Sequence, residues 1–330
     1  MKKITATHSV TEALAGIPDE EQAEIVLEPR VYEEKIFSEK QDLTLTGAGA
    51  GKSILLWRDA AFTMLDDGFK RGTFRSYTAF FGGKRLVLRD LTIRNDAGDG
   101  RLAGQSVAAY LDSTHVFAEN CDFISCQDTL FLSPLPDEVR EPRGFMGPRE
   151  NTPRLLTRQY FKNCRIIGDV DFIFGGADAV FENCEIICRD REHVPGMESE
   201  AGAEDFINGY LTAPCGKRDG LGLVFLNCTI SAQVGTRPGT VYLGRPWRPE
   251  GKAAFLECTY TDAIAPLRFS GWGSIDKDEP DAGLCEYKPM TADRRPLDIS
   301  SRNPWVRLLD DSEANEIKKN AAALKSEITV

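Results

Sequence analysis

Five stretches of this sequence repeat one phrase: FAENCDF (117–123), YFKNCRI (160–166), VFENCEI (180–186), FLNCTI (225–230) and FLECTY (255–260). A sixth copy, LRDLTI (88–93), has leucine in place of the cysteine. The equivalent positions Leu91, Cys121, Cys164, Cys184, Cys228 and Cys258 are separated by 30, 43, 20, 44 and 30 residues. Each copy alternates apolar and polar residues, as a β-strand does. Strand-like copies with a shortest spacing near 20 residues predict a solenoid.

The predicted fold class is all-β: a parallel β-helix with about ten coils of about 22 residues each. Stacked coils place equivalent residues above one another, so the five cysteines are predicted to form an internal column of small side chains. An asparagine precedes four of these cysteines. These asparagines are predicted to form a ladder of amide hydrogen bonds along the stack: Asn120, Asn163, Asn183 and Asn227.

We expect a single domain over residues 1–330 with short helical end caps. Ser9 and Glu12 form a capping-box pattern that begins a short helix at the N-terminal end. Residues 312–325 are rich in helix formers, and a helix or tail there is expected to cover the other end. Residues 133–158 are interpreted as a loop inserted between coils.

Composition narrows the classes of partner. The 330 residues carry 40 Lys and Arg against 51 Asp and Glu, a net charge of −11, which argues against nucleic acid. There is no run of apolar residues long enough for a membrane-spanning helix, so we expect no membrane contact. Lys2 and Lys3 are followed by polar residues, so we expect no secretory signal and a cytoplasmic location. We also expect the protein to be a monomer. The nine cysteines include no C-x2-C pair and are expected to form neither disulfides nor a zinc site.

Two motif-like stretches are interpreted as structural. GAGAGKS (47–53) lacks the first glycine of a phosphate-binding loop because Thr46 occupies that position, so we expect a glycine-rich turn. GQSVA (104–108) resembles a serine-hydrolase elbow, but its flanking residues follow a strand pattern.

The repeat brings two carboxylates together. Asp128 lies seven residues after Cys121, and Asp171 lies seven residues after Cys164, so stacked coils place them side by side. Two close like charges resist joint ionisation, and the pKa of one of them rises. Such a pair supplies an acid and an anion from identical side chains.

A third segment, TVYLGRPW (240–247), supplies a cation and an aromatic surface. Arg245 is expected to pair with one carboxylate and hold it ionised. Trp247 offers the flat apolar face on which sugar rings stack.

Four segments together resemble the signature sequences of pectin methylesterases, in the order found in that family: GQSVAAYL (104–111), QDTL (127–130), GDVDFIFG (168–175) and YLGRPW (242–247). The resemblance extends from about residue 10 to about residue 310. It implies a right-handed, single-stranded parallel β-helix. It also implies hydrolysis of the methyl ester on C6 of galacturonate, in pectin or in methyl-esterified oligogalacturonides, with release of methanol and no metal or cofactor.

The resemblance also implies a role for each site residue. Asp171 matches the nucleophile, and Asp128 matches the general acid that then becomes the base. Gln127 matches the donor that stabilises the oxyanion, assisted by Gln105. Arg245 matches the residue that orients Asp171. The residues matching substrate contacts or the cleft wall are Trp247, Phe174 and Val170.

One departure from the family pattern lies beside the proposed nucleophile, and a nearby loop suggests a preference for short substrates. Asp169 stands where the family usually has threonine, and on a regular strand it would share a face with Asp171 and add like charge beside it. The loop 133–158 carries several arginines that are hypothesised to wall the cleft and bind free carboxylates of short substrates: Arg140, Arg143, Arg149, Arg154 and Arg158.

Other functions remain open at this point. A β-helix lyase or glycosidase acting on uronates is one alternative, and an inactive carbohydrate-binding solenoid is another.

Overall fold

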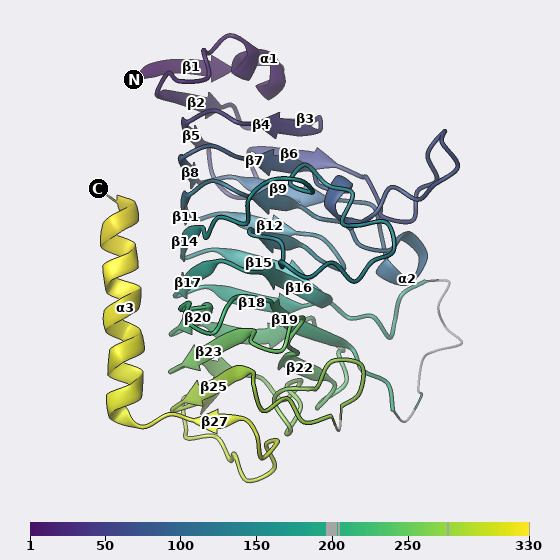
Figure 1. Ribbon diagram of the computed structural model, residues 1–330, viewed down its shortest axis with the longest axis vertical. Coiled ribbons are helices and arrows are strands. Elements are labelled where there is room, and N and C mark those ends of the chain that lie inside the picture. The colour runs from purple at the N-terminus through teal and green to yellow at the C-terminus, as the bar shows by residue number, and fades with distance from the viewer. Residues whose placement is uncertain (196–202, 204, 276, 330) are drawn as a thin grey trace.

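The computed structural model describes residues 1–195, 203, 205–275 and 277–329. Within these residues the chain winds through three parallel sheets, and successive coils add one rung after another (Figure 1). The prediction of a parallel β-helix is therefore confirmed.

The sheets differ in length, and the described residues form eleven, nine and seven strands in them. The eleven-stranded sheet contains β1 (Lys2–Ala6), β2 (Ala23–Leu27), β5 (Asp42–Thr46), β8 (Arg85–Arg89), β11 (His115–Glu119), β14 (Arg158–Lys162), β17 (Asp178–Glu182), β20 (Leu223–Leu226), β23 (Lys252–Leu256), β25 (Gly283–Tyr287) and β27 (Arg307–Leu308). The nine-stranded sheet contains β3 (Val31–Glu33), β6 (Ile54–Trp57), β9 (Thr92–Asn95), β12 (Asp122–Ile124), β15 (Arg165–Gly168), β18 (Glu185–Cys188), β21 (Thr229–Ala232), β24 (Thr259–Tyr260) and β26 (Met290–Thr291). The seven-stranded sheet contains β4 (Ile36–Ser38), β7 (Ala79–Phe81), β10 (Ala109–Leu111), β13 (Leu130–Leu132), β16 (Val170–Gly175), β19 (Gly209–Pro214) and β22 (Val241–Gly244).

The interior is filled by columns of equivalent side chains, as expected for stacked coils. The five repeat cysteines are buried in one such column, and all nine cysteines of the chain are free and buried. Beside them runs a stack of phenyl rings with centroids 4.6, 4.7 and 4.4 Å apart: Phe161, Phe181, Phe225 and Phe255. Burial of such columns is the main stabilising contribution in the fold.

Among the described residues, the asparagine side chains do not form the predicted continuous ladder along the stack. They lie exposed at the turn between the eleven- and nine-stranded sheets, where the backbone is left-handed with φ of 52 to 55°. Asparagine tolerates this conformation, which explains the repeated residue. The ladder runs through main-chain bonds from one coil to the next, and the side-chain amide of Asn120 bonds to Asp90 at 3.0 Å.

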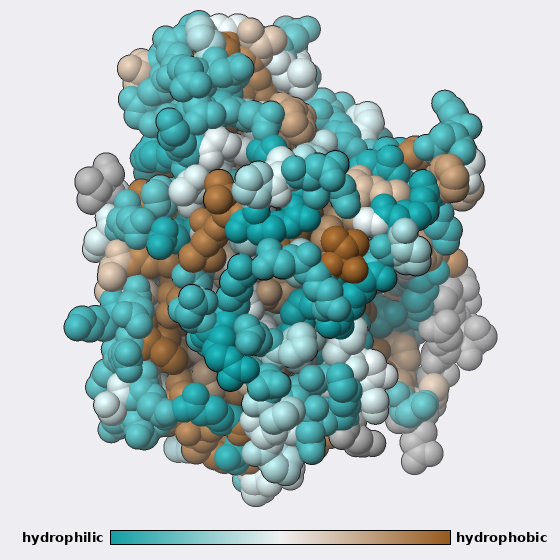
Figure 2. Space-filling view, viewed as in Figure 1, coloured by the Kyte–Doolittle hydropathy of each residue, from teal (hydrophilic) through white to brown (hydrophobic). Residues whose placement is uncertain are grey.

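The C-terminal helix α3 (Asp311–Thr329) does not cover the end of the solenoid, so that expectation was wrong. It lies along the outer face of the eleven-stranded sheet (Figure 1) and contacts β11 and β14. That face carries an apolar stripe that includes Val87, Phe117 and Val180, against which Leu324 and Ile328 are buried. Apolar side chains gather along the border between α3 and the sheet (Figure 2). The stripe, rather than an open end, therefore determines where the helix packs.

The N-terminal cap is confirmed. The helix α1 (Val10–Ala15) begins after Ser9, whose hydroxyl accepts a bond from the amide of Glu12. The carboxylate of Glu34 accepts bonds from the amides of Val10 and Thr11, so it completes the cap from a neighbouring coil.

The connections hold two short helical elements, η1 (Thr73–Arg75) and α2 (Gly100–Ala103). GAGAGKS (47–53) forms a turn, and Ser106 is fully buried, so neither false motif offers a reactive site. Residues 133–157 form a loop without helix or strand between β13 and β14. No helix in the described parts of the chain has the length and apolar character needed to cross a membrane.

Candidate active site

Adjacent coils bring Asp128 and Asp171 together. The pairing of β13 with β16 aligns Leu130 with Ile173, an offset of 43 residues that also relates Asp128 to Asp171. The amide of Asp128 donates to the carbonyl of Val170 at 3.0 Å, which ties the two segments directly. The vertical spacing inferred from the cysteines therefore holds at the two carboxylates.

The backbone is irregular at both aspartates. Their φ values are 64° at Asp128 and 51° at Asp171, in the left-handed region that aspartate tolerates better than most residues. The register between β16 and β19 shifts between Val170 and Ile173, which marks a bulge at Asp171. Bulges re-aim side chains next to active sites, and this one breaks the strand alternation on which a shared face for Asp169 and Asp171 was expected.

Arg245 forms two parallel hydrogen bonds with the carboxylate of Asp171. Its Nε and one terminal nitrogen lie 3.0 and 2.7 Å from the two carboxylate oxygens. The guanidinium lies between the rings of Tyr210 and Trp272, 4.0 and 4.6 Å from their centroids. Burial lowers the pKa of Arg245, but the charge of Asp171 and the hydrogen bonds to it, with smaller contributions from Tyr210 and Asp128, together raise this pKa above its usual value. The pair is a fork-to-fork contact that fixes the position of the carboxylate.

Asp128 has the opposite environment. It is 8% exposed, and burial raises its pKa well above the usual range. The charge of Asp171 raises that pKa further, whereas Arg245 and a hydrogen bond from Gln127 lower it. The raised pKa favours the neutral form of Asp128, which lies beside a carboxylate that is ion-paired with Arg245.

These groups face a cavity of about 270 Å³. All the predicted site residues line it except Val170, whose role here is the backbone bond to Asp128. The lining also includes residues that sequence reasoning missed: Thr73, Phe74, Glu141, Ala213 and Trp272. Trp272 lies in SGWG (270–273), where an aromatic residue between glycines is a usable signal. Phe74 and Glu141 carry no such signal.

Aromatic rings form one wall of the cavity. Trp247 stacks on Phe74 with centroids 6.3 Å apart and meets Phe174 edge-on at 6.0 Å. The amide group of Gln127 packs closely against Gly100 of α2. Only glycine fits there, since a Cβ at this position would lie 2.7 Å from the Oε1 of Gln127. Gln105 and Gln127 therefore bring two amide groups to the same cavity as the aspartates.

Asp169 is buried beside this cavity but turned to its own backbone. Its Oδ1 accepts a bond of 2.7 Å from the amide of Val170. Burial raises its pKa to about 6, although Arg191 and Arg189 oppose the shift. Its charge is also a minor cause of the raised pKa of Asp128.

The raised pKa of Asp169 makes stability depend on pH. The folded state gains stability from binding a proton at Asp169. This contribution is fully present below pH 3.8, the pKa of the group in the unfolded chain, and it is lost as pH rises through about 6. We expect Asp169→Asn to remove this dependence, so that between about pH 4 and pH 8 the wild type loses about 3 kcal/mol relative to the variant. Urea unfolding of both proteins at the two pH values measures this. Parallel changes in the two free energies of unfolding would contradict the assignment.

The loop arginines do not line the cavity. Arg140 pairs with Glu138, Arg149 with Glu39 and Asp112, and Arg158 with Glu327 of α3. The remaining two also have neighbours: Arg154 bonds to carbonyls of the loop itself, and Arg143 lies over the ring of Phe69. The structure gives no support to the hypothesis that these arginines bind free carboxylates in the cleft.

The described residues contain no group of three or more His, Cys, Asp or Glu arranged to hold a metal ion.

A sequence model of the Pectinesterase family matches residues 3–135 and 154–316. The chain belongs to the pectinesterase family. Among relatives in this family, Pectinesterase 31 of Arabidopsis thaliana is 30% identical over 317 residues, covering 93% of this chain and 85% of the relative. Probable pectinesterase 8 of the same plant is 30% identical over 290 residues, covering 86% of this chain. The chain spans 63% of that relative's length.

Solved pectin methylesterases share the fold of this pectinesterase-family chain. The enzyme from carrot superposes with a TM-score of 0.73 at 24% identity, covering 95% of this chain and 89% of the other. PemA from Erwinia chrysanthemi gives 0.72 at 24% identity, covering 96% and 94%. A pectin methylesterase in complex with a hexasaccharide also gives 0.72 at 24% identity, covering 95% and 94%.

Proposed function

We propose that this protein hydrolyses C6 methyl esters of galacturonate in pectin or oligogalacturonides and releases methanol. The observation that carries the proposal is the pair of carboxyl groups in one cavity, one ion-paired with Arg245 and the other with a strongly raised pKa. Family membership supports the same reaction. A solved pectin methylesterase with the same fold is in complex with a hexasaccharide, which supports a sugar chain as the substrate.

In the first half of the reaction, the ionised carboxylate of Asp171 attacks the ester carbonyl. The amide groups of Gln127 and Gln105 are placed in the cavity to donate to the oxyanion of the tetrahedral intermediate. Asp128, whose raised pKa favours the protonated form, transfers its proton to the departing methoxide. Methanol leaves, and an acyl–enzyme bond joins the substrate carbonyl to Asp171.

In the second half, Asp128 is ionised and acts as a base. It takes a proton from a water molecule, and the resulting hydroxide attacks the acyl–enzyme. Cleavage restores the carboxylate of Asp171, and Asp128 is again protonated. The second product is a uronate whose new carboxyl group ionises in water.

The substrate charge is compatible with an acidic protein. A methyl-esterified uronate is neutral, so a net charge of −11 does not repel it. Trp247 and Phe174 offer apolar faces to a sugar ring beside the reacting ester.

The test is a product assay with methyl-esterified oligogalacturonides of defined length. We expect methanol in equal amount to new carboxyl groups, with neither new reducing ends nor unsaturated products. New reducing ends would identify a glycosidase, and unsaturated products a lyase. Binding of the oligomers without any product would identify an inactive carbohydrate-binding solenoid. The cytoplasmic location, the monomeric state and a preference for short chains stay predictions.

A further inference from the structure

The charges of the cavity leave one carboxylate without a matching cation on the cavity wall. Four charged residues line it: Asp128, Glu141, Asp171 and Arg245. Arg245 is paired with Asp171, and the raised pKa of Asp128 favours its neutral form. Two cations outside the wall, Arg140 and Arg248, both contact Glu138, and the charge of Glu141 also acts on both of them. Glu141 therefore adds a negative charge to the cavity wall, and among the described residues no cation within ion-pair distance offsets it.

Glu141 belongs to a segment that the family model does not match. The family match stops at residue 135 and resumes at residue 154, so residues 136–153 lie outside it. This segment forms most of the loop between β13 and β14. A role for Glu141 is therefore argued from the contacts of this chain and not from the family match.

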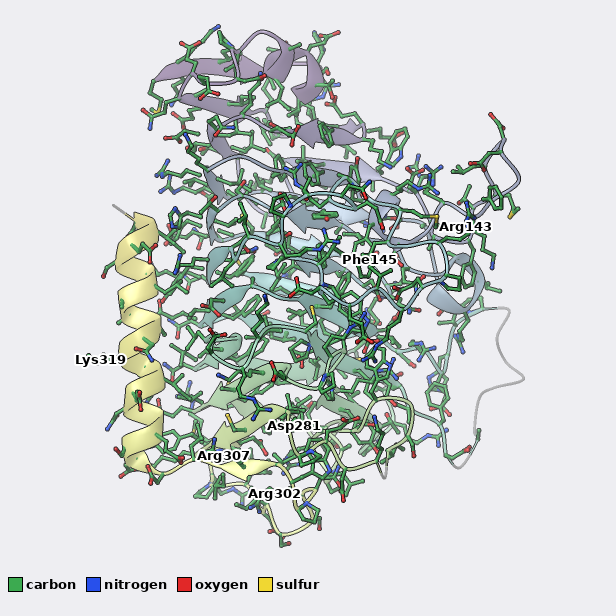
Figure 3. All side chains as sticks on the ribbon, in the orientation of Figure 1. Arg143, Phe145, Asp281, Arg302, Arg307 and Lys319 are labelled. Carbon is green, nitrogen blue, oxygen red and sulfur yellow. The ribbon has the colours of Figure 1, made fainter. Side chains whose placement is uncertain are left out.

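The segment is anchored on the side that faces the cleft. Phe145 is buried against Phe74 and Trp247, with ring centroids 5.4 and 6.2 Å apart, and Figure 3 shows it over the body of the molecule. Arg143, two residues earlier, lies farther out in the same view. Arg149 reaches Glu39 on another coil at 2.7 Å.

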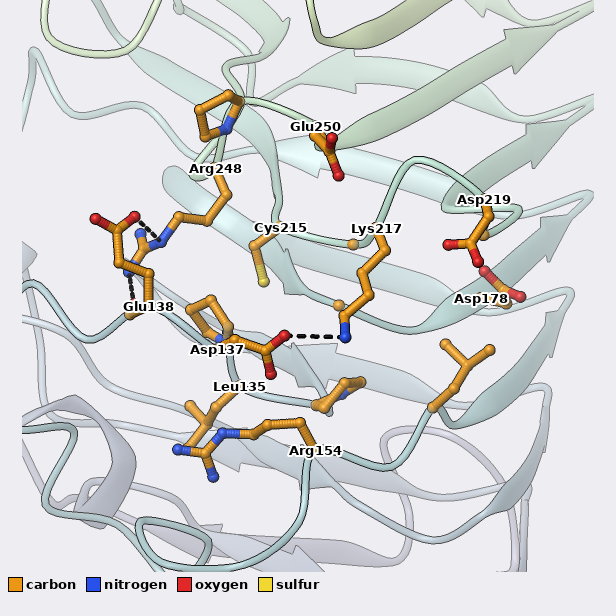
Figure 4. A pocket seen from close by; sticks show the side chains of 17 residues that line it. Leu135, Asp137, Glu138, Arg154, Asp178, Cys215, Lys217, Asp219, Arg248 and Glu250 are labelled. Carbon is orange, nitrogen blue, oxygen red and sulfur yellow. Dashed lines mark hydrogen bonds and ion pairs between the residues drawn. The ribbon is translucent and has the colours of Figure 1, made fainter.

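The other side of the segment is anchored as well. Asp137 pairs with Lys217 at 2.9 Å, and Arg248 donates a bond of 2.7 Å to the carbonyl of Glu138. Figure 4 shows these contacts around a second pocket, whose lining shares no residue with that of the cavity beside the aspartates. At Glu141 itself, the carboxylate accepts a bond from the amide of Arg140, and the carbonyl accepts one from Gly144. Glu141 is therefore held at the mouth of the cavity.

We propose that Glu141 is a specificity-determining residue that excludes ionised uronates from the cavity while admitting their neutral methyl esters. This inference rests on the proposed function. The reaction converts a neutral ester into an anion within the same cavity, so the substrate and product differ by one negative charge. A fixed carboxylate at the mouth repels the product and every unesterified unit but leaves the ester unaffected.

The test measures binding of unesterified trigalacturonate by titration calorimetry to the full-length protein. Glu141→Gln keeps the side-chain size and removes the charge. We expect it to bind the trimer about fivefold more tightly than the wild type at low salt, since exposed charges interact modestly. The difference should shrink in about 1 M NaCl, where screening is strong. Glu141→Lys, which reverses the charge, should tighten binding further.

The matched control is Glu12→Gln, which removes one exposed charge on α1 far along the chain from the loop. Equal affinity of Glu141→Gln and wild type, or equal tightening by Glu12→Gln, would overturn the proposal, as would failure of all the variants to bind. Binding by the Glu141 variants alone would support it. Methanol release is measured separately, so its absence would refute the proposed function without altering the binding result.

Discussion

Replacing Asp171 by asparagine is expected to lower methanol release by a factor of about 10⁴ or more, the usual scale for loss of a covalent nucleophile. The amide can still accept a bond from Arg245, but it has no negative charge with which to attack the ester. Asparagine also tolerates the left-handed backbone at this position, where φ is 51°. The measurement is initial methanol release on a fully methylated oligogalacturonide, together with a cooperative unfolding curve.

The structure offers a matched control for this substitution. Asp90 has nearly the same backbone, with φ of 54°, but lies in the exposed turn column where other coils carry asparagine. Asp90→Asn should therefore keep the wild-type rate. If Asp171→Asn kept more than about a tenth of that rate, the nucleophile would have to be another group.

Asp128→Asn is expected to reduce methanol release by a factor of about 10² to 10⁴, the usual range for loss of general acid–base catalysis. In the wild type, Asp128 must be protonated to release methanol, so activity should fall as pH rises through the raised pKa of Asp128. That falling limb should be missing from the pH–rate profile of the variant. A variant profile identical in shape to that of the wild type would remove Asp128 from the acid role.

The leaving group provides a second readout for Asp128. A nitrophenyl ester of galacturonate needs no proton to depart, so Asp128→Asn should release the first equivalent of nitrophenol rapidly. Hydrolysis of the acyl–enzyme still needs a base, so a slow phase should follow the burst. A slow first turnover would instead place the defect in substrate binding or in Asp171.

The repeat explains how much could be predicted from sequence. Because a solenoid stacks coils at a fixed offset, the 43 residues between Cys121 and Cys164 also relate Asp128 to Asp171. The asparagines that precede the cysteines lie in a left-handed turn, a conformation that asparagine tolerates. The spacing of apolar residues in the sequence could not predict that this turn is exposed and left-handed.

Features that depend on contacts between distant segments could not be predicted. The position of α3 follows from the outward residues of five or more coils, which no local pattern describes. Likewise, the bulge at Asp171 broke the strand alternation used for Asp169, and the loop placed Glu141 rather than an arginine at the cavity. In each case tertiary packing overrode a rule that holds for isolated strands or loops.

The position of α3 has a consequence for biosynthesis. A β-helix can grow rung by rung as the chain emerges, since each coil needs only the one before it. The stripe through Val87, Phe117 and Val180, however, is covered by residues translated more than a hundred positions later. Until α3 docks, a nascent chain presents a ridge of apolar side chains to its surroundings. The coils can therefore assemble one after another, but their apolar stripe is protected from aggregation only after residues 311–329 have been synthesised and have packed against it.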